Sequence, residues 1–231
     1  MSEEQINNNS DLIADKIAVF DLDGTITYKD TYVDFLLYCL RKRPSRILRG
    51  GALVVYLLMY KSGIRSNHWL KARYLGTVAG GLHRAELDSL AESFSQQSFE
   101  KNIKPEALQE LSELKARGYT LVLATASFEF YVSKLFVLLK MDYLLCSSAV
   151  FDSRDCLVGK LAGKNCLGAE KARRVRELCA EQQWSGVELA YSDDMVDEPL
   201  FELADTALVV DPKPMNESKA RSMGYRVLNW R

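Results

Sequence analysis

The 231-residue sequence contains only two histidines, and its five cysteines are scattered without any CxxC pair. A zinc site and a disulfide framework are therefore not expected, and reduced thiols in a cytoplasmic protein are predicted. The sequence also lacks an excess of either charge, because 30 basic and 31 acidic residues leave a net charge of −1. Since this gives no bulk attraction to nucleic acid, no nucleic-acid partner is expected, and any recognition by charge must be local.

Long hydrophobic runs are missing as well. The apolar run at 52–60 (ALVVYLLMY) is shorter than the stretch of about 20 residues that a membrane-spanning helix needs. Residues 1–14 are polar and acidic, without the basic start or the apolar core of a secretory signal. We expect a disordered lead-in there, followed by a globular protein with one core or one core carrying an inserted domain.

The chain is organised around residues 17–27 (IAVFDLDGTIT), where an apolar run leads directly into Asp21 and Asp23. A short apolar run that ends in a polar, glycine-containing turn is typical of a buried strand whose carboxyl end reaches a site. Two carboxylates this close repel each other unless a cation offsets them, which favours Mg²⁺ with oxygen ligands. The alternative is an Asx turn, in which both carboxylates only cap backbone N–H groups.

Helical and strand patterns alternate in the second half of the sequence. A helix over 104–117 is followed by a buried strand over 119–125. The other expected strands come after it, at 142–148, 187–191 and 206–210, with a β-hairpin at 149–160. This alternation predicts an α/β fold with a doubly wound parallel sheet.

The stretch between the first strand and this alternating part shows helical patterns only. Residues 30–100 are therefore expected to form an all-helical domain inserted into a core that comprises 15–29 and 101–231. A basic cluster precedes the apolar run of the insertion, and its members are Arg41, Lys42, Arg43, Arg46 and Arg49. A buried helix with solvated arginines is the favoured interpretation. The alternative is peripheral contact with anionic lipid through residues 41–60.

Several predicted strands end in carboxylates or hydroxyls, at the edge where parallel sheets bind their ligands. These residues are Asp21, Asp23, Thr125, Ser127, Asp193, Asp194 and Asp197. Lys171 or Lys164 could offset part of their negative charge. Carboxylates, hydroxyls, one lysine and Mg²⁺ suit phosphoryl transfer, in which an Asp side chain can itself accept the phosphoryl group.

Four segments together resemble the haloacid dehalogenase superfamily of aspartate-nucleophile phosphatases, and most of all its subgroup that includes phosphoserine phosphatase. They are FDLDGTIT at 20–27, LVLATAS at 121–127, NCLGAEKARRVREL at 165–178 and AYSDDMVDEPLFELAD at 190–205. The resemblance spans nearly the whole chain from residue 17. It implies a Rossmann-like core, a helical cap formed by the insertion, and hydrolysis of phosphomonoesters with Mg²⁺.

The resemblance also implies catalytic and phosphate-binding roles. Asp21 would attack phosphorus and become an aspartyl-phosphate, while Asp23 would protonate the leaving oxygen and then activate water. Thr125 and Ser127 would hold phosphate oxygens. Lys171, which fits the third segment better than Lys164, would neutralise charge.

The implied metal site has one departure from the family pattern. Its Mg²⁺ ligands would be Asp21, the backbone carbonyl of Asp23, and Asp193, with Asp197 supporting them. The family commonly has Gly-Asp-Ser in the fourth segment, whereas Ser192 and Asp194 flank Asp193 here. Asp194 is expected either to become a second metal contact or to point to solvent.

The cap would choose the substrate in this family. Asp30 stands where phosphoserine-directed members carry an acidic residue that reads the substrate amine, and it can equally be a helix N-cap. Arg65 and Arg73 are candidates for binding a substrate carboxylate. The expected substrate is a small phosphomonoester such as phosphoserine. The alternatives are a lipid phosphate at the inner face of the membrane, phosphotransfer to an alcohol, and phospho-ligand binding without catalysis.

Overall fold

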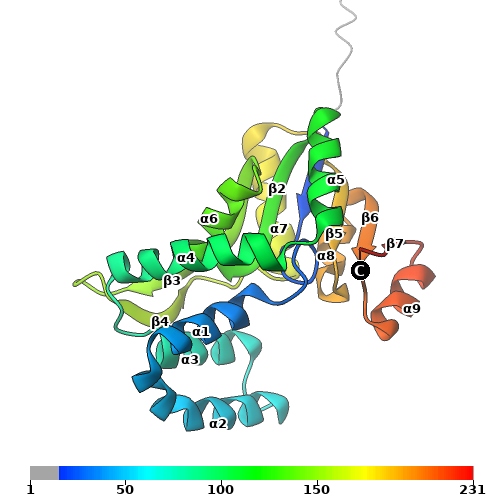
Figure 1. Cartoon of the computed structure of the whole chain (residues 1–231). Helices are drawn as coiled ribbons and strands as arrows, with labels where there is room; N and C mark the ends of the chain where they lie inside the picture. Colours follow the sequence, from blue (N-terminus) through cyan, green and yellow to red (C-terminus); the bar gives the residue numbers. More distant parts are fainter. Residues whose placement is uncertain (1–15, 231) are drawn as a thin grey trace, which may run out of the picture.

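The computed structural model describes residues 16–230, except for the side chains of residues 47–50. The expected lead-in at 1–14 and the side chain of Arg49 lie outside the described residues. A seven-stranded sheet has the order β4-β3-β2-β1-β5-β6-β7 (Figure 1). Its strands are β1 (Ile17–Phe20), β2 (Thr120–Phe128), β3 (Tyr143–Phe151), β4 (Leu157–Ala162), β5 (Val187–Ser192), β6 (Ala204–Val210) and β7 (Arg226–Leu228). Neighbours from β3 to β7 pair in parallel and β4 pairs antiparallel with β3, so the predicted α/β fold is confirmed.

The centre of the sheet brings the predicted site segments together. β1 lies between β2 and β5, with Phe20 opposite both Leu123 and Tyr191. Because these strands run parallel, the residues that follow the three positions emerge at the same carboxyl edge. Asp21 is thereby placed beside the last residues of β2 and the loop after β5.

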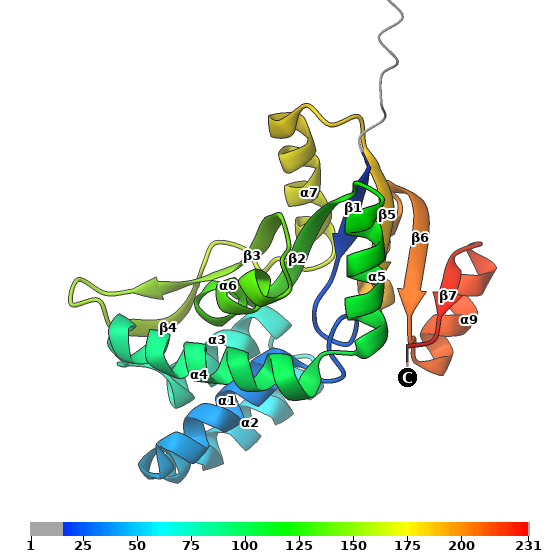
Figure 2. The same cartoon turned by 45° about the horizontal axis from the view of Figure 1, so that its top comes forward.

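Helices cover both faces of the sheet, as in a doubly wound fold (Figure 2). One face packs against α4 (Arg84–Asn102), α5 (Pro105–Ala116) and α6 (Glu129–Leu138), and the other against α7 (Ala169–Gln182), α8 (Glu198–Phe201) and α9 (Pro214–Ser222). Ala18 and Phe20 of β1 belong to the first layer, whereas Ile17 and Val19 belong to the second. Since both sides of β1 are buried, the strand is apolar along its whole length.

The predicted helices of the insertion are present. They are α1 (Thr31–Lys42), a 3-10 turn at Pro44–Arg49, α2 (Gly50–Lys61), α3 (Asn67–Val78) and α4. In Figure 1, α1, α2 and α3 lie beyond the carboxyl ends of the strands, and α2 lies farthest from the sheet. In contrast, α4 packs on the core helix α6, where the Ser95 hydroxyl donates to the carbonyl oxygen of Tyr131 at 2.9 Å.

The interpretation of residues 52–60 as a buried helix is wrong. None of residues 51–61 is buried, and Val54, Val55 and Leu58 are 60%, 53% and 61% exposed. The inner side of α2 has only limited contacts, among them the edge-on approach of the Tyr56 and Trp69 rings, with centroids 5.4 Å apart. Because the helix is apolar on every side, packing one side against α3 leaves apolar side chains on its other sides exposed.

The strand predicted at 142–148 and the first arm of the hairpin predicted at 149–160 are one strand, β3, which pairs antiparallel with β4. Helix α3 packs against this hairpin. Gly159 of β4 meets Gly76 of α3 so closely that a Cβ on Gly159 would lie 2.2 Å from the Cα of Gly76. The insertion therefore contacts the edge hairpin of the sheet.

A buried ion pair fixes the loop after β1 to the end of the chain. Lys104 Nζ lies 2.9 Å from Asp211 Oδ2 and also donates to the carbonyl oxygen of Gly24. The other carboxylate oxygen of Asp211 accepts from the backbone N–H of Trp230 at 2.9 Å. Elements far apart in the sequence thus hold the Asp21–Gly24 turn from behind.

Candidate active site

The carboxylate of Asp21 is buried at the carboxyl end of β1, with 7% of the residue exposed. Its backbone N–H continues the sheet ladder by donating to the carbonyl oxygen of Tyr191 at 2.9 Å. Lys171 Nζ lies 2.7 Å from Asp21 Oδ1, and the Thr25 hydroxyl donates to Oδ2 at 3.4 Å. The two residues that the first and third sequence segments predicted as partners are therefore in direct contact.

Asp197 positions this lysine. Its Oδ2 accepts from Lys171 Nζ, and from the Ser192 hydroxyl at 2.9 Å. Its Oδ1 accepts from the backbone N–H of Gly168 at 3.0 Å, where α7 begins. Burial alone would lower the pKa of Lys171, but the carboxylates of Asp197 and Asp21 outweigh it and raise that pKa. Lys171 is therefore a fixed ammonium group.

Asp193 lies across the turn from Asp21. A Cβ on Gly24, which has φ of +82°, would lie 2.4 Å from Asp193 Oδ2. Only a glycine allows the carboxylate this close to the turn, because it has no Cβ and adopts a positive φ without strain. The glycine of the DxDGT string thus makes room for the carboxylate that the fourth segment supplies.

Asp23 is held by three hydrogen bonds. Its Oδ1 accepts from the backbone N–H and the hydroxyl of Thr31, both at 2.6 Å. Its Oδ2 accepts from the Ser127 hydroxyl at 2.5 Å. Thr31 is the first residue of α1, so the first helix of the insertion begins with a residue that holds Asp23. No feature of the sequence predicts this contact.

Thr125 and Ser127 are both buried at the end of β2. The Thr125 hydroxyl accepts from the backbone N–H of Ser127 at 3.0 Å, which fixes the bend of the chain there. Thr125 thus lies at the carboxyl edge, as predicted. Ser127 is engaged with Asp23 rather than left open for a ligand.

The site concentrates negative charge. Burial raises the pKa of Asp21, although Lys171 opposes this rise. Burial also raises the pKa of Asp193 to about 6, and the neighbouring carboxylate of Asp194 adds to the shift. A divalent cation with oxygen ligands would offset this repulsion, and the donors here are of the type that Mg²⁺ prefers.

Carboxylates alone do not complete a metal site. Within residues 16–230, no group of three or more His, Cys, Asp or Glu side chains is arranged to hold a metal ion. A cation at Asp21 and Asp193 would therefore need backbone carbonyl, water or phosphate oxygens as further ligands.

The departures in the fourth segment have local structural explanations. The Ser192 side chain is fully buried and bonds to Asp197, as described above. The Asp194 carboxylate accepts from the backbone N–H of Val196 at 3.0 Å and caps a short 3-10 helix, Met195–Asp197. Both side chains are engaged within the protein.

The remaining candidates from the sequence have other contacts in the structure. Asp30 is the N-cap of α1, where its side chain accepts from the backbone N–H of Val33 at 2.9 Å. Lys164 is exposed, in contrast to Lys171. The guanidinium groups of Arg65 and Arg73 lie over the Trp69 ring, 5.3 and 5.7 Å from its centroid.

Lys71 is a candidate site residue that the sequence does not predict. It comes from α3, yet its side chain is buried and its Nζ donates to the carbonyl oxygen of Ala126 and to Asn165 Oδ1. Burial lowers the pKa of Lys71 to about 8, against the opposing charges of Asp23 and Asp30. The Lys71 side chain therefore extends from the insertion to a position between the segments 121–127 and 165–178.

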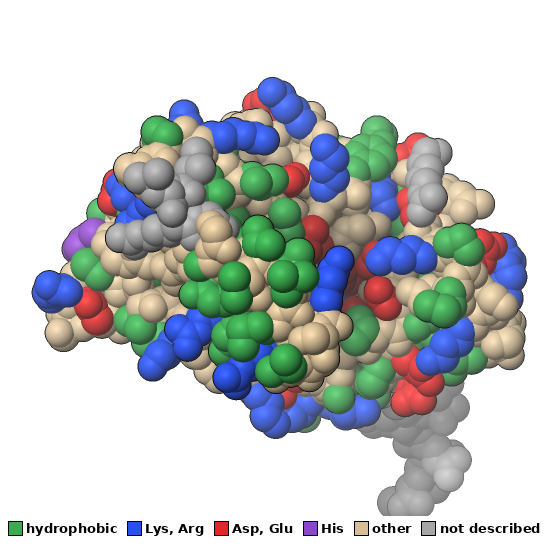
Figure 3. Space-filling view, turned by 90° about the horizontal axis from the view of Figure 1, so that it is seen from below, with side chains coloured by type: hydrophobic (Ala, Val, Ile, Leu, Met, Phe, Trp, Pro, Cys, Tyr) green, Lys and Arg blue, Asp and Glu red, His purple; other side chains and the backbone are tan. Residues whose placement is uncertain are grey.

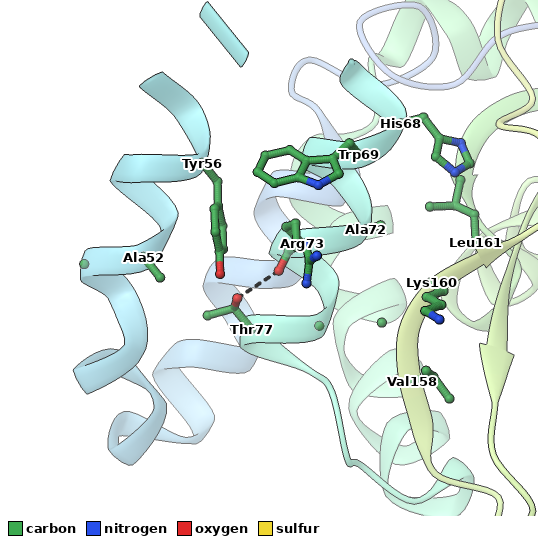
Figure 4. A pocket seen from close by; sticks show the side chains of 13 residues that line it. Ala52, Tyr56, His68, Trp69, Ala72, Arg73, Thr77, Val158, Lys160 and Leu161 are labelled. Atoms are coloured by element: carbon green, nitrogen blue, oxygen red, sulfur yellow. Dashed lines mark hydrogen bonds between the residues drawn. The ribbon is translucent and has the colours of Figure 1, made fainter. Parts of the chain in front are cut away.

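A cavity of about 880 Å³ lies between α2, α3 and β4, away from Asp21 (Figure 4). Figure 4 shows Tyr56 on α2 across from Trp69 and Arg73 on α3, with Lys160 on the wall formed by β4. None of the described residues that line this cavity is Asp or Glu. Its chemistry is aromatic and cationic.

Comparisons place this geometry among known proteins. A family model described as haloacid dehalogenase-like hydrolase matches residues 18–202. The probable phosphatase Rv3661 of Mycobacterium tuberculosis (strain ATCC 25618 / H37Rv) is 26% identical over 222 residues, which cover 92% of this chain and 75% of that protein. A structure of a protein with unknown function from Bordetella pertussis Tohama I has a TM-score of 0.82 at 20% identity, covering 94% of this chain and 100% of the other. A substrate-bound phosphoserine phosphatase has a TM-score of 0.66 at 15% identity, covering 93% and 92%. These structures share the fold.

Proposed function

Because this chain belongs to the haloacid dehalogenase-like hydrolase family, we propose that it is a Mg²⁺-dependent phosphomonoester hydrolase acting through an aspartyl-phosphate on Asp21. The observation that best supports this proposal is the buried Asp21 carboxylate 2.7 Å from Lys171 Nζ. A nucleophilic carboxylate must be ionised. Burial raises the pKa of Asp21 and disfavours this form, whereas the adjacent ammonium group, and Mg²⁺ when it is bound, would favour it. The same ammonium group would neutralise charge on the bound phosphoryl group.

Asp23 is the proposed acid and base. In its protonated form Asp23 would give its proton to the leaving oxygen as Asp21 displaces it. The resulting carboxylate would then take a proton from the water that hydrolyses the aspartyl-phosphate, which restores the acid. The bonds from Thr31 and Ser127 fix the direction of its carboxylate. Thr125 and Ser127 are proposed as phosphate-binding hydroxyls, and Ser127 would exchange its bond to Asp23 for one to substrate.

The proposed metal site consists of Asp21, the backbone carbonyl of Asp23, and Asp193, with Asp197 as its support. When bound, Mg²⁺ would neutralise negative charge on the phosphoryl oxygens. The close packing of Asp193 against Gly24 supports this assignment, because it holds a second carboxylate at the turn. Asp194 is not included, since it caps the 3-10 helix.

Residues 30–100 are proposed as a cap on the core formed by 15–29 and 101–231. A small phosphomonoester such as phosphoserine, in the cytoplasm, is the proposed substrate. Asp30 and Lys71 both come from this part of the chain. The charges of Asp23 and Asp30 act to raise the pKa of Lys71, so both carboxylates lie near its ammonium group. Asp30 and Lys71 are therefore the proposed contacts for the part of the substrate beyond phosphorus.

The test is phosphate release from an aryl phosphate ester with and without Mg²⁺. Wild type is expected to turn over, whereas Asp21→Asn should lose at least about a thousandfold in kcat because the nucleophile is gone. The matched control is Asp205→Asn, which removes an exposed carboxylate from β6. Undiminished turnover by Asp21→Asn would refute the nucleophile assignment.

A lipid-phosphate substrate is the second candidate, and the unburied apolar helix α2 favours it. A screen of phosphoserine, sugar phosphates, nucleotides and lysophospholipid phosphates separates the two substrate classes. Adding an alcohol acceptor to the same screen distinguishes hydrolysis from phosphotransfer, since transfer would yield a new phosphate ester. A binding protein without catalysis would bind phosphate esters and release no phosphate.

A further inference from the structure

We propose that helix α2 docks this protein onto an anionic phospholipid surface. The outer side of α2 presents Val54, Val55 and Leu58, each more than half exposed, and Ile64 after the helix is 67% exposed. No helix within residues 16–230 is long and apolar enough to cross a membrane. The proposal is therefore a helix that lies in the membrane interface, with its apolar side inward.

Charge complementarity identifies the partner. Between Asp34 and Glu86 the sequence has no Asp or Glu, although it has ten Lys and Arg residues there. The remaining 20 Lys and Arg residues share the rest of the chain with all 31 acidic residues. In a chain of net charge −1, the segment that carries the exposed apolar helix thus has ten cationic and no anionic side chains.

Several of these cations are available to a ligand. Arg43 and Arg84 pair with Glu86 and Asp155, and Lys71 is buried. Five others are exposed, and among the described residues no carboxylate lies within 4 Å of any of them; they are Arg41, Lys42, Lys61, Arg65 and Arg73. Lys61 ends α2, and Arg65 stacks on Trp69, which contacts Tyr56 of α2. Cations next to an inserted apolar face are attracted to anionic headgroups.

Figure 3 shows this side of the molecule. Hydrophobic side chains gather in the middle of the face, Lys and Arg side chains surround them, and acidic side chains are visible in a hollow beside them. The helices α1, α2 and α3 lie beyond the carboxyl edge of the sheet (Figure 1). Docking through α2 would therefore bring the carboxyl edge of the sheet toward the membrane.

A second copy of this chain fits the surface less well than a membrane does. A symmetric dimer built on α2 would place the same cations opposite each other, since a two-fold interface pairs each patch with itself. Like charges at that distance repel. An anionic bilayer supplies both an apolar layer for Val54 and Leu58 and a negative surface for Lys61 and Arg65.

Sedimentation with sucrose-loaded vesicles tests the proposal without relying on the proposed function. Wild type is expected to bind vesicles of phosphatidylcholine with about 30% phosphatidylglycerol, but not phosphatidylcholine alone, and to dissociate in about 0.5 M NaCl. Val54→Ser with Leu58→Ser, and separately Lys61→Glu with Arg65→Glu, should each lower the partition coefficient by about tenfold or more. Circular dichroism and thermal unfolding check that the variants fold.

Matched controls change the same chemistry elsewhere. Val137→Ser with Met215→Ser removes two exposed apolar side chains that lie outside α2, and Arg176→Glu with Lys213→Glu reverses two exposed cations outside the insertion. Both controls should bind as wild type. Absence of vesicle binding by wild type would overturn the proposal, as would equal losses in the controls. It would also be overturned if sedimentation equilibrium showed a wild-type dimer that Val54→Ser with Leu58→Ser converts to monomer.

Discussion

The carboxylate of Asp193, a proposed metal ligand, opposes folding of the metal-free protein at neutral pH. Burial and the neighbouring Asp194 raise its pKa to about 6 from the ordinary 3.8. The folded state therefore holds this proton more tightly than the unfolded state, and the stability contribution, complete below pH 3.8, is lost as the pH rises through about 6. At pH 7 the ionised side chain destabilises the metal-free protein.

Asp193→Asn should consequently stabilise the metal-free protein at pH 7. We expect a gain of about 1–2 kcal/mol, reduced from the full linkage value because Asp193 is partly exposed. Urea unfolding in EDTA measures it, and the gain should vanish near pH 4. Mg²⁺ should raise the Tm of wild type but not of the variant. A variant that is less stable than wild type in EDTA would contradict this account.

For Lys71 we expect the opposite pH dependence of stability, at alkaline pH. Its pKa is lowered from 10.5 to about 8, so the unfolded state binds more protons between these values and this group makes stability rise with pH. Relative to wild type, Lys71→Met should lose this rise, which amounts to about 1 kcal/mol per pH unit. Urea unfolding at several pH values across this window measures it. Lys16→Met, at an exposed position, should leave the slope unchanged.

These two residues also mark the limits of sequence reasoning about the site. The position of Asp193 could be predicted, because it directly follows an apolar strand, as Asp21 does. Lys71 could not, because a lysine in a basic helical stretch has the same pattern as a solvated one. Its burial depends on how α3 lies over the core, which local sequence does not encode. The bond between Ser127 and Asp23 is equally a product of tertiary structure.

The close packing of helix α3 on strand β4 depends more on Gly159 than on Gly76. A Cβ on Gly159 would lie 2.2 Å from the Cα of Gly76, and Gly159 has φ of +76°. We expect Gly159→Ala to destabilise the protein by about 2 kcal/mol or more, through backbone strain and overpacking. Urea unfolding gives the loss, and hydrogen exchange should show it concentrated in α3 and β4.

Gly76→Ala is the matched control for this contact. Its Cβ would meet the Cα of Gly159 at 3.5 Å, which is an ordinary contact distance. Because Gly76 lies within α3, alanine should be neutral or stabilising by about 0.5–1 kcal/mol. Equal losses in both variants would show that the tight approach is not what joins α3 to the hairpin.

Elements differ in how far their sequence patterns determine them. The polar residues 152–155 between two apolar stretches are sufficient to predict the hairpin of β3 and β4. A glycine within a strand is a known sign of close backbone approach. Helix α2 was predicted as a helix but placed wrongly in the core. Its apolar residues lie on every side of the helix, so the sequence alone does not indicate which side packs against the rest of the protein.

The whole molecule is held together by contacts between distant parts of the chain, and the parallel sheet was the part that the sequence predicted best. Alternation of buried strands with helices specifies a sheet with two helical layers, because each apolar strand needs cover on both faces. The packing of α4 on α6 escaped prediction, since a helix next to the insertion can join either part. Polar contacts across the core, such as Lys104 with Asp211, leave no periodic signal.

The buried ion pair of Lys104 and Asp211 should contribute strongly to stability. Lys104 and Asp211 are almost fully buried, with side chains 3% and 4% exposed, and they join the start of α5 to the segment after β6. Lys104→Met should destabilise the protein by about 3–5 kcal/mol, because a buried carboxylate loses its ammonium partner. Lys115→Met breaks the exposed pair with Asp142 and should cost about 1 kcal/mol or less. Urea unfolding of both variants measures the difference, and similar small losses would mean that water or the backbone replaces the lysine. Since Lys104 also holds the Gly24 carbonyl behind Asp21, the same variant should lower phosphatase kcat more than Lys115→Met does.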